Sequence, residues 1–280
     1  MQKSAVRDIR IKKVSKGDVS EEGDMIAVEE PLEIQIQYQS DGKTIKKSIS
    51  VTMRTPGNDE ELATGFLFTE GILHDRSQIS KVGADIYDEN KVLITLAENQ
   101  VPKLQTSERN FYTTSSCGVC GKSSIDAIKT VSSFAHQSDE LSVPVKLFFT
   151  LQNALKKQQE VFQNTGGLHA SGLFDLEGNV ILLKEDVGRH NALDKVIGAS
   201  FLNNQLPLNE TILLLSGRAS FELIQKASMA GIKIVAAIGA PSSLALQLAE
   251  EFGITLIGFL GNERFNIYSG SHRIKIDNTL

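Results

Sequence analysis

The stretch Thr211–Gly239 (TILLLSGRASFELIQKASMAGIKIVAAIG) decides the fold class. It holds two short apolar runs, TILLL at 211–215 and IVAAI at 234–238, and the residues between them, 219–230, have helical spacing. Short runs that are apolar at every position are typical of parallel strands buried on both faces, and the helix between them supplies the crossover. The alternation extends backward to a helix over 188–203 and forward to a helix over 242–252 and a strand over 255–259. The sequence therefore predicts an α/β layered fold for the C-terminal half.

The first hundred residues follow a different pattern, in which apolar residues occupy alternate positions. Residues 32–38 and 45–53 alternate around the turn Asp41-Gly42, and residues 82–86 and 92–96 alternate around a second turn. This predicts two hairpins with one buried face each. Between them we expect a helix that Asn58 or Asp59 caps and that ends near Gly71. The N-terminal part is therefore expected to be a small β-rich α+β unit.

Residues 113–124 separate the two patterns and are expected to form a flexible loop. After this loop, a helix is expected from Pro144 to about Phe162, followed by short strands over 169–174 and 180–184. We predict three parts: a smaller N-terminal β-rich α+β domain over 1–112, the loop over 113–124, and an α/β domain over 125–280.

Composition narrows the class of protein. The 280 residues carry a net charge of -5 at pH 7, which argues against a general nucleic-acid binder. No apolar run reaches the roughly 18 residues needed to span a bilayer, and the basic N-terminus lacks the apolar core of a secretory signal. Two cysteines cannot build a disulfide framework and fit a reducing compartment. We expect a cytoplasmic protein that binds neither nucleic acid nor membrane.

Both cysteines, Cys117 and Cys120, lie in the segment TTSSCGVCGKSSI at 113–125. Their small polar neighbours predict an accessible loop. Ser123 or Ser124 can cap a following helix, whose N-terminus favours a thiolate. Such a dithiol can bind a metal, exchange disulfides or carry sulfur.

One zinc-binding motif and one nucleotide-binding motif are present only in part in this chain. Zinc needs about four ligands, yet His169, His190 and His272 are not spaced as ligand pairs, and no H-x-E precedes a P-C-x-x-C. No bound zinc or other metal is therefore expected. The segment Ser116–Ser123 nearly matches a P-loop, but Ser116 stands where the first Gly belongs and no apolar strand precedes it.

Four turns at the carboxyl ends of predicted strands share Gly, Ser or Arg. They read EDVGRH at 185–190, SGRAS at 216–220, GAPSS at 239–243 and LGNER at 260–264. Ligands of open parallel sheets bind beyond these ends, and backbone N–H groups at helix N-termini attract anions. Arg189, Arg218 and Arg264 add donors suited to phosphate. We infer a phosphate-bearing, nucleotide-like ligand.

Further candidates at the same edge are Ser216 and Gly217 in the second turn, His190, and His169 beside a Gly-Gly turn. In a separate hypothesis, the side chains of Asp186, His190 and Asp194 bind a nucleotide base or position a proton. Arg54 is instead expected to tie the first hairpin to the helix that follows it.

Several segments together resemble the FdhD/NarQ family of formate dehydrogenase accessory sulfurtransferases. The resemblance covers nearly the whole chain and implies a homodimer whose C-terminal domain is similar to the three-layer α/β fold of cytidine deaminases, without their zinc chemistry. The segments are RTPGNDEELATGFLFTEGI, SSCGVCGKSSID, TGGLHASGLFD, EDVGRHNALDKVIG, LLLSGRASFELIQKA and GFLGNERFNIYS.

The resemblance also implies a function. A cysteine desulfurase would load Cys117 with sulfur as a persulfide, Cys120 would assist, and the sulfur would pass to molybdenum bis(molybdopterin guanine dinucleotide), bound as a substrate, before this cofactor enters the formate dehydrogenase apoenzyme. Gly261-Asn262 stands where the family would have a more basic pair. The family's cofactor segment falls on Phe259, Leu260, Gly261, Asn262, Glu263 and Arg264.

Two alternatives stay open. One is a non-catalytic chaperone that binds the cofactor and uses its cysteines only for protection. The other is a zinc-dependent, deaminase-like hydrolase.

Overall fold

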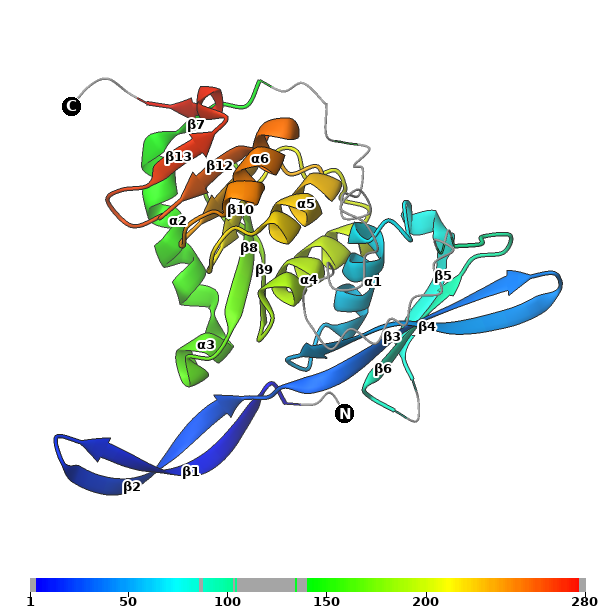
Figure 1. Ribbon diagram of the computed structural model, residues 1–280, viewed down its shortest axis with the longest axis horizontal. Coiled ribbons are helices and arrows are strands. Elements are labelled where there is room, and N and C mark those ends of the chain that lie inside the picture. Colours follow the sequence, from blue (N-terminus) through cyan, green and yellow to red (C-terminus); the bar gives the residue numbers. More distant parts are fainter. Residues whose placement is uncertain (1–3, 86–87, 103, 105–133, 135–139, 277–280) are drawn as a thin grey trace.

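The computed structural model describes residues 4–85, 88–102, 104, 134 and 140–276 (Figure 1). In this part of the chain the strands form four sheets, and the fold is mixed α/β. Cys117, Cys120, the predicted loop over 113–124 with its P-loop-like segment, and the helix expected after Ser123 or Ser124 all lie outside the described residues.

The central six-stranded sheet contains the alternation that the sequence predicts. Its three middle strands run parallel, whereas the other three join antiparallel. All residues of these parallel strands are buried, which explains their continuous apolar runs. In order across the sheet the strands are β13 (Asn266–Ser269), β12 (Thr255–Gly258), β11 (Ile234–Ala237), β10 (Ile212–Leu215), β8 (His169–Phe174) and β9 (Val180–Asp186).

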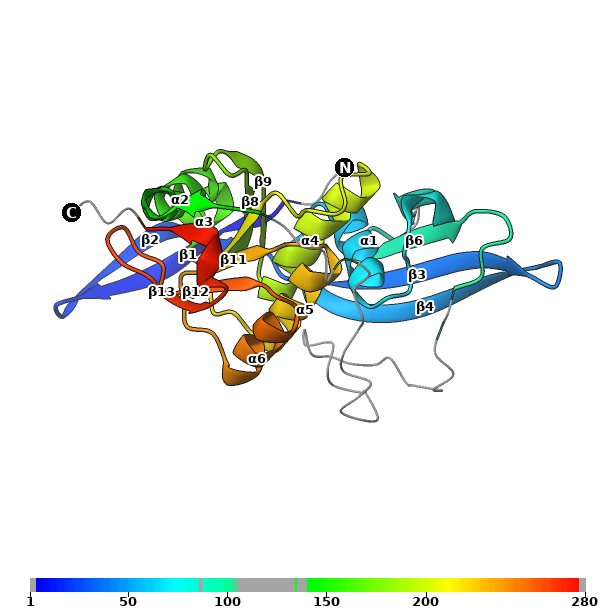
Figure 2. The same cartoon turned by 90° about the horizontal axis from the view of Figure 1, so that it is seen from above.

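Helices cover both faces of this sheet (Figure 2). On one face, α2 (Val145–Gln158) buries Phe148, Leu151 and Leu155 against β8, β10 and β11. The other face is covered by α4 (Arg189–Leu202), α5 (Phe221–Met229) and α6 (Ser243–Glu251). The resulting layers agree with the predicted α/β class, and the more specific likeness to cytidine deaminases stays a prediction.

The helix expected from Pro144 to Phe162 is in fact two helices. After α2, the backbone of Gln159 has φ -82° and ψ 71°, outside the helical region, and α3 (Glu160–Thr165) then begins. Before α2, the two-residue strand β7 (Val143–Pro144) pairs with β14 (Ile274–Lys275), which ties the end of the chain to this region.

A four-stranded sheet forms most of the N-terminal part. It confirms both predicted hairpins, β3–β4 and β5–β6. The helix α1 (Asp59–Thr69) covers the apolar face of this sheet. Asn58 takes the N-cap position without a capping bond from its side chain, and Asp59 accepts hydrogen bonds from Arg54 instead. The strand order is β4 (Lys43–Arg54), β3 (Glu30–Ser40), β6 (Lys91–Leu96) and β5 (Ile79–Ala84), and the short helix η1 (Arg76–Gln78) precedes β5.

The helices α1 and α4 cross with their backbones in contact. A Cβ atom on Gly65 would overlap the carbonyl oxygen of Asp194, and one on Gly198 would overlap the carbonyl oxygen of Glu61. Only glycine permits this approach. The crossing joins the N-terminal sheet and one face of the central sheet into a single apolar core.

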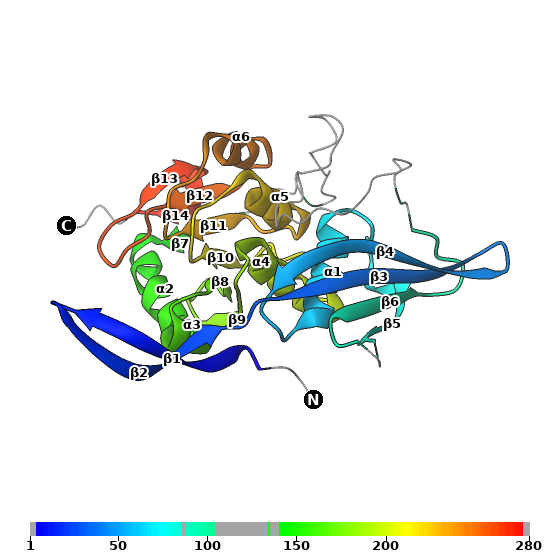
Figure 3. The ribbon, with the colours of Figure 1, turned by 60° about the horizontal axis from the view of Figure 1, so that its bottom comes forward.

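A long hairpin, β1 (Val6–Ser15) and β2 (Asp18–Ala27), forms a two-stranded sheet of its own. It extends away from the rest of the molecule beneath α3 (Figure 3). Near its base, Ala27 lies close to Gly167, just after α3. We refer to this hairpin as the arm.

Candidate functional site

The structure brings the four predicted turns together at one edge of the central sheet. Backbone hydrogen bonds join neighbouring turns: the N–H of Gly239 donates to the carbonyl of Gly217 (2.9 Å), and the N–H of Phe259 donates to that of Gly239 (3.1 Å). Because β8 and β9 pair antiparallel, the start of β8 and the end of β9 lie at this edge too. We call the edge the rim; it comprises His169 and residues 186–190, 216–220, 239–242 and 259–264.

His169 and the SGRAS turn face each other closely. The N–H of Ala170 donates to the Ser216 hydroxyl (2.8 Å), and a Cβ on Gly217 would lie 3.4 Å from Nδ1 of His169. Burial, and then the charge of Arg189, lower the pKa of His169, while Asp186 acts in the opposite direction. His169 is therefore a neutral imidazole near pH 7, able to donate or accept a hydrogen bond.

Two buried polar atoms near His169 lack a hydrogen-bond partner within the described residues. They are Nε of Arg189 and the hydroxyl of Ser171, which lies two residues along β8 from His169 on the same face. Buried polar groups are rarely left unsatisfied in folded proteins. These two atoms are therefore candidates to meet a ligand at the rim.

Glu222 is a polar residue of this region that lies outside the four turns predicted from the sequence. It lies in the first turn of α5, where its carboxylate oxygen is 3.9 Å from Nε2 of His190, and the Ser220 hydroxyl is 3.5 Å from the same nitrogen. Burial raises the pKa of Glu222, but its own backbone N–H, Ser220 and the charges of His190 and Arg189 together lower it. The only sign of Glu222 in the sequence is its position two residues after the turn SGRAS at 216–220.

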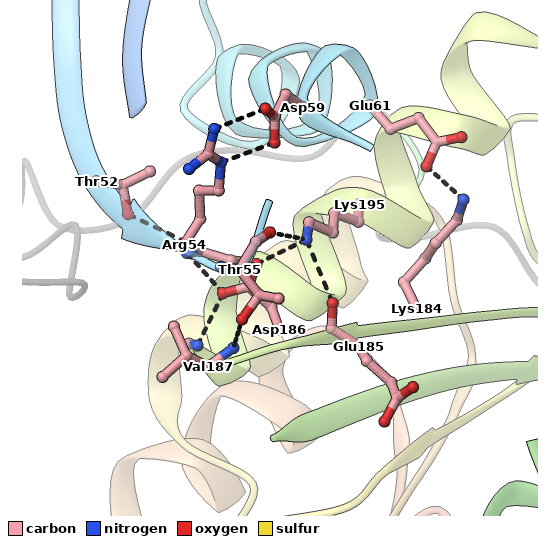
Figure 4. A network of polar contacts seen from close by, with 12 residues as sticks. Thr52, Arg54, Thr55, Asp59, Glu61, Lys184, Glu185, Asp186, Val187 and Lys195 are labelled. Carbon is pink, nitrogen blue, oxygen red and sulfur yellow. Dashed lines mark hydrogen bonds and ion pairs between the residues drawn. The ribbon is translucent and has the colours of Figure 1, made fainter. Parts of the chain in front are cut away.

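Asp186 lies in a buried network that holds the rim in place (Figure 4). Its side chain is fully buried and pairs with Lys195 at 2.7 Å. It also accepts hydrogen bonds from the N–H groups of Thr55 (3.2 Å) and Gly188 (2.8 Å) and from the Asn191 amide (3.0 Å). All of its acceptor capacity is used inside the protein, so Asp186 positions the start of α4 and is not free to bind a ligand.

Asp194 is not exposed to the rim either. Its carboxylate pairs with Lys226 at 2.9 Å and accepts from the Thr69 hydroxyl at 3.0 Å. Burial raises the pKa of Asp194, and Lys226 opposes this. The hypothesis that Asp186 and Asp194 bind a base is therefore wrong, and His190 is the member of that set left at the rim. Arg54 does tie the hairpin to α1, as expected, through Asp59 (2.8 Å).

The residues of the last rim turn, 259–264, differ in how far they are exposed to solvent. Phe259 has φ 53°, in the left-handed region, and its side chain is 48% exposed. Leu260 is 2% exposed and belongs to the core, so only its backbone is near the surface. The N–H of Gly261 donates to the carbonyl of Arg264 (2.9 Å), which closes the turn and leaves Asn262, Glu263 and Arg264 exposed, as Arg218 also is.

The remaining candidates lie apart or outside the described residues. His272 is in η3 (Ser271–Arg273), after β13, and is not a rim residue. In the described part of the chain there is no cluster of three His, Cys, Asp or Glu side chains that could hold a metal ion. No helix described by the structure is long and apolar enough to cross a membrane.

Comparison with known proteins identifies the family. A model of the FdhD/NarQ family matches residues 27–275. The sulfur carrier protein FdhD of Mycolicibacterium paratuberculosis is 46% identical over 275 residues, covering 95% of this chain and 97% of the relative. The protein of the same name from Sulfolobus acidocaldarius is 38% identical over 271 residues, covering 97% and 99%.

A solved structure has the same fold. The crystal structure of a proposed formate dehydrogenase accessory protein from Desulfotalea psychrophila superposes with a TM-score of 0.73. It covers 97% of this chain and 100% of that one, at 22% sequence identity. The family match and the identities over nearly the full length lead to one conclusion: this chain belongs to the FdhD/NarQ family.

Proposed function

We propose that this chain is a sulfur carrier in the maturation of formate dehydrogenase, with Cys117 as the residue that holds the sulfur. The observation that supports the proposal most is the 46% identity, over nearly the full length, to a relative named sulfur carrier protein FdhD. The cysteine pair, the only one in the chain, has the chemistry that the role requires.

The first step loads the sulfur. The Cys117 thiolate attacks the outer sulfur of a persulfide on a cysteine desulfurase. A new S–S bond forms on Cys117, the old one breaks, and the desulfurase cysteine leaves as a thiolate, so no net oxidation occurs.

The second step delivers it. The Cys120 thiolate attacks Sγ of Cys117 and displaces the outer sulfur as hydrosulfide. The two cysteines are oxidised to a disulfide, which a cellular thiol must then reduce. The acceptor, as a substrate, is the molybdenum bis(molybdopterin guanine dinucleotide) cofactor, on its way to the formate dehydrogenase apoenzyme.

The rim has the donors that such a substrate needs. Phosphate groups fit beside Arg189, Arg218 and the backbone N–H groups at the start of α4 and α5. The unpartnered Nε of Arg189 and hydroxyl of Ser171 add buried donors next to His169.

Loading of Cys117 is tested by mass spectrometry of the intact protein after incubation with a cysteine desulfurase and cysteine. We expect Cys120→Ala, which cannot expel the sulfur, to gain one sulfur mass that a thiol reductant removes, and Cys117→Ala to gain none. A sulfur adduct that persists in Cys117→Ala would contradict the assignment.

The cofactor-binding chaperone predicts a different result. Under that alternative, Cys117→Ala still supports formate dehydrogenase activity in cells that lack the wild-type protein, whereas the sulfur carrier requires that activity to be lost. The zinc hydrolase would instead require near-stoichiometric zinc in protein purified without chelator.

The rim is tested separately with GDP, which represents the nucleotide part of the cofactor. Arg218→Ala should weaken GDP binding about tenfold or more, because a charge-assisted hydrogen bond to phosphate contributes roughly 1.5–3 kcal/mol. Isothermal titration calorimetry measures the change. Arg7→Ala, an equal loss of charge on the arm, is the control and should leave the affinity unchanged. Equal affinity in Arg218→Ala and the wild type would contradict a phosphate site at this turn.

A further inference from the structure

Both outer edges of the arm lack a neighbouring strand in the described part of the chain. The strands β1 and β2 form a sheet of only two strands, so each pairs along one edge and leaves its other edge open. Near the base of the arm β2 packs against α3, whereas no packing of comparable extent is found for β1 within the described residues. The outer edge of β1 over residues 8–14 is therefore the more accessible one, and we call it the β1 edge.

The turn at the tip of the arm determines which backbone groups point outward along the β1 edge. The strands are joined by Lys16-Gly17, whose φ angles of 51° and 97° are typical of a two-residue type I′ turn. The residues that flank such a turn, here Ser15 and Asp18, form a hydrogen-bonded pair, and pairs of this kind alternate along an antiparallel ladder. The N–H of Val28 donates to the carbonyl of Ala5 (2.9 Å), which fits this alternation. The backbone N–H and C=O groups that point away from β2 along the edge are therefore those of Asp8, Arg10, Lys12 and Val14.

The side chains of these four residues all lie on one face of the arm, because successive side chains of a strand alternate between its two faces. All four are exposed, and Val14 is 70% exposed. Glu21 stands opposite Lys12 on β2, yet within the described residues neither Lys12 nor Arg10 forms an ion pair. Gly23, opposite Arg10, has no side chain. The β1 edge thus combines open hydrogen-bonding groups with two cations at alternate positions and an apolar valine.

We propose that the β1 edge is a docking site for an extended segment of another protein in which acidic residues alternate with apolar ones. Such a segment adds to the arm as a third, antiparallel strand and bonds to the outward N–H and C=O groups, as in other cases of strand addition. Its carboxylates lie opposite Lys12 and Arg10 on the exposed face, where opposite charges directly across two strands attract each other. Its apolar side chains lie on the other face, beside the half-buried Ile9 and Ile11.

Basic residues on an open edge also have a simpler role, which is to prevent unwanted strand pairing. That protection acts against neutral and basic segments and becomes an attraction for an acidic one. An edge that only needs protection is often short, whereas β1 and β2 have ten residues each. A hairpin of two strands is at best marginally stable in water, and a third strand supplies the stability that it lacks. Length and charge together therefore favour an edge that receives a strand over an edge that is only blocked.

Docking at the β1 edge involves neither the cysteines nor the rim, so a peptide and the full chain are enough to test it. The probe is a fluorescently labelled peptide in which Glu alternates with Ile and Val, and its match carries Lys in place of every Glu. Fluorescence anisotropy at low salt should show binding of the acidic peptide that weakens as salt rises, because salt screens exposed charges. The basic peptide should bind at least about tenfold more weakly.

Methylated peptides separate strand addition from attraction between charges alone. In an antiparallel third strand, the residues directly opposite Arg10 and Lys12 exchange hydrogen bonds with them, so the Glu N–H groups of the peptide face β1. Methylating the backbone nitrogen of each Glu should therefore abolish binding, whereas methylating that of each Ile and Val should leave most of it. These experiments use the wild-type protein, so they do not depend on how well a variant folds.

Arg10→Glu tests the contact between side chains. Residue 10 stands opposite Gly23, so the reversal puts no like charge directly across the arm. The variant should bind the acidic peptide about tenfold more weakly and the basic peptide more tightly, two opposite changes that an unfolded arm does not produce. Lys43→Glu, an equal change of charge at the exposed tip of the β3–β4 hairpin, is the control and should change neither affinity.

Several results would overturn the proposal. They are an acidic peptide that does not bind or binds no better than the basic one, equal binding of the two methylated peptides, and an Arg10→Glu variant with wild-type affinities. Self-association of the free protein that Arg10→Glu abolishes would also overturn it, since a second copy of the chain would then occupy the edge.

Discussion

A Lys195→Met variant is expected to lose about 3–5 kcal/mol of folding free energy, the usual cost of removing one partner of a buried ion pair. Lys195 is 2% exposed, and its ammonium group donates to Asp186 (2.7 Å) and to the carbonyl of Thr55 (3.0 Å). Methionine fills similar space but leaves the Asp186 carboxylate charged and buried with one donor fewer. Urea unfolding followed by circular dichroism measures the loss.

The control is an exposed ion pair of the same kind. Lys91 pairs with Asp88 at 3.2 Å, and both side chains are more than a third exposed. Exposed pairs contribute at most about 1 kcal/mol, so Lys91→Met should change stability little. In the double variant Lys195→Met with Asp186→Asn, part of the loss should be recovered, because the uncompensated charge is gone. If Lys195→Met is no more damaging than Lys91→Met, the network does not hold the rim as described.

Gly198→Ala is expected to lower stability by about 3 kcal/mol, at the upper end of the range for overpacking. The added methyl group would overlap the Glu61 carbonyl and approach the backbone nitrogen of Gly65 to 2.7 Å. Both are main-chain atoms, so α1 and α4 must move apart along their contact. This outweighs the gain of roughly 1 kcal/mol that alanine has over glycine within a helix.

Gly23→Ala is the matched control for this substitution. Nothing lies within 4 Å of the place where its Cβ would stand, and its φ is not positive. We expect its midpoint of unfolding to stay close to that of the wild type, whereas that of Gly198→Ala falls. A Gly198→Ala protein as stable as Gly23→Ala would mean that the two helices are not in backbone contact.

The strands of the central sheet are the part of the fold that the sequence predicts best. The apolar runs locate β10, β11 and β12 within one residue at either end, because a strand buried on both faces leaves little choice of residue. The direction of β8 is not encoded in this way. The sequence of β8 fits either direction, and the strand lies antiparallel between β9 and β10 because a tight turn follows it and the α4 crossover passes over it.

For the candidate site, the sequence predicts the rim but not its support. Gly, Ser and Arg after strands are a local signal, and parallel strands necessarily end at one edge. The contact between Thr55 and Asp186 joins residues 131 positions apart, and a single Asp in a polar turn looks the same whether it binds a ligand or a buried lysine. Only the packing of the folded chain decides whether such an Asp meets a ligand or a buried lysine. Here the carboxylate of Asp186 accepts hydrogen bonds from Lys195 and from three further donors.

Phe259 has a backbone conformation that is unfavourable for a residue with a side chain. At φ 53° a residue other than glycine is disfavoured by about 1 kcal/mol or more, and a side chain that is 48% exposed gains little from burial in return. Selection for stability alone would place glycine there. Positions where the local choice conflicts with the fold are expected at functional sites. Phe259 is such a frustrated position, and the free protein tolerates it at the edge of the rim, where an exposed aromatic ring is available to a ligand.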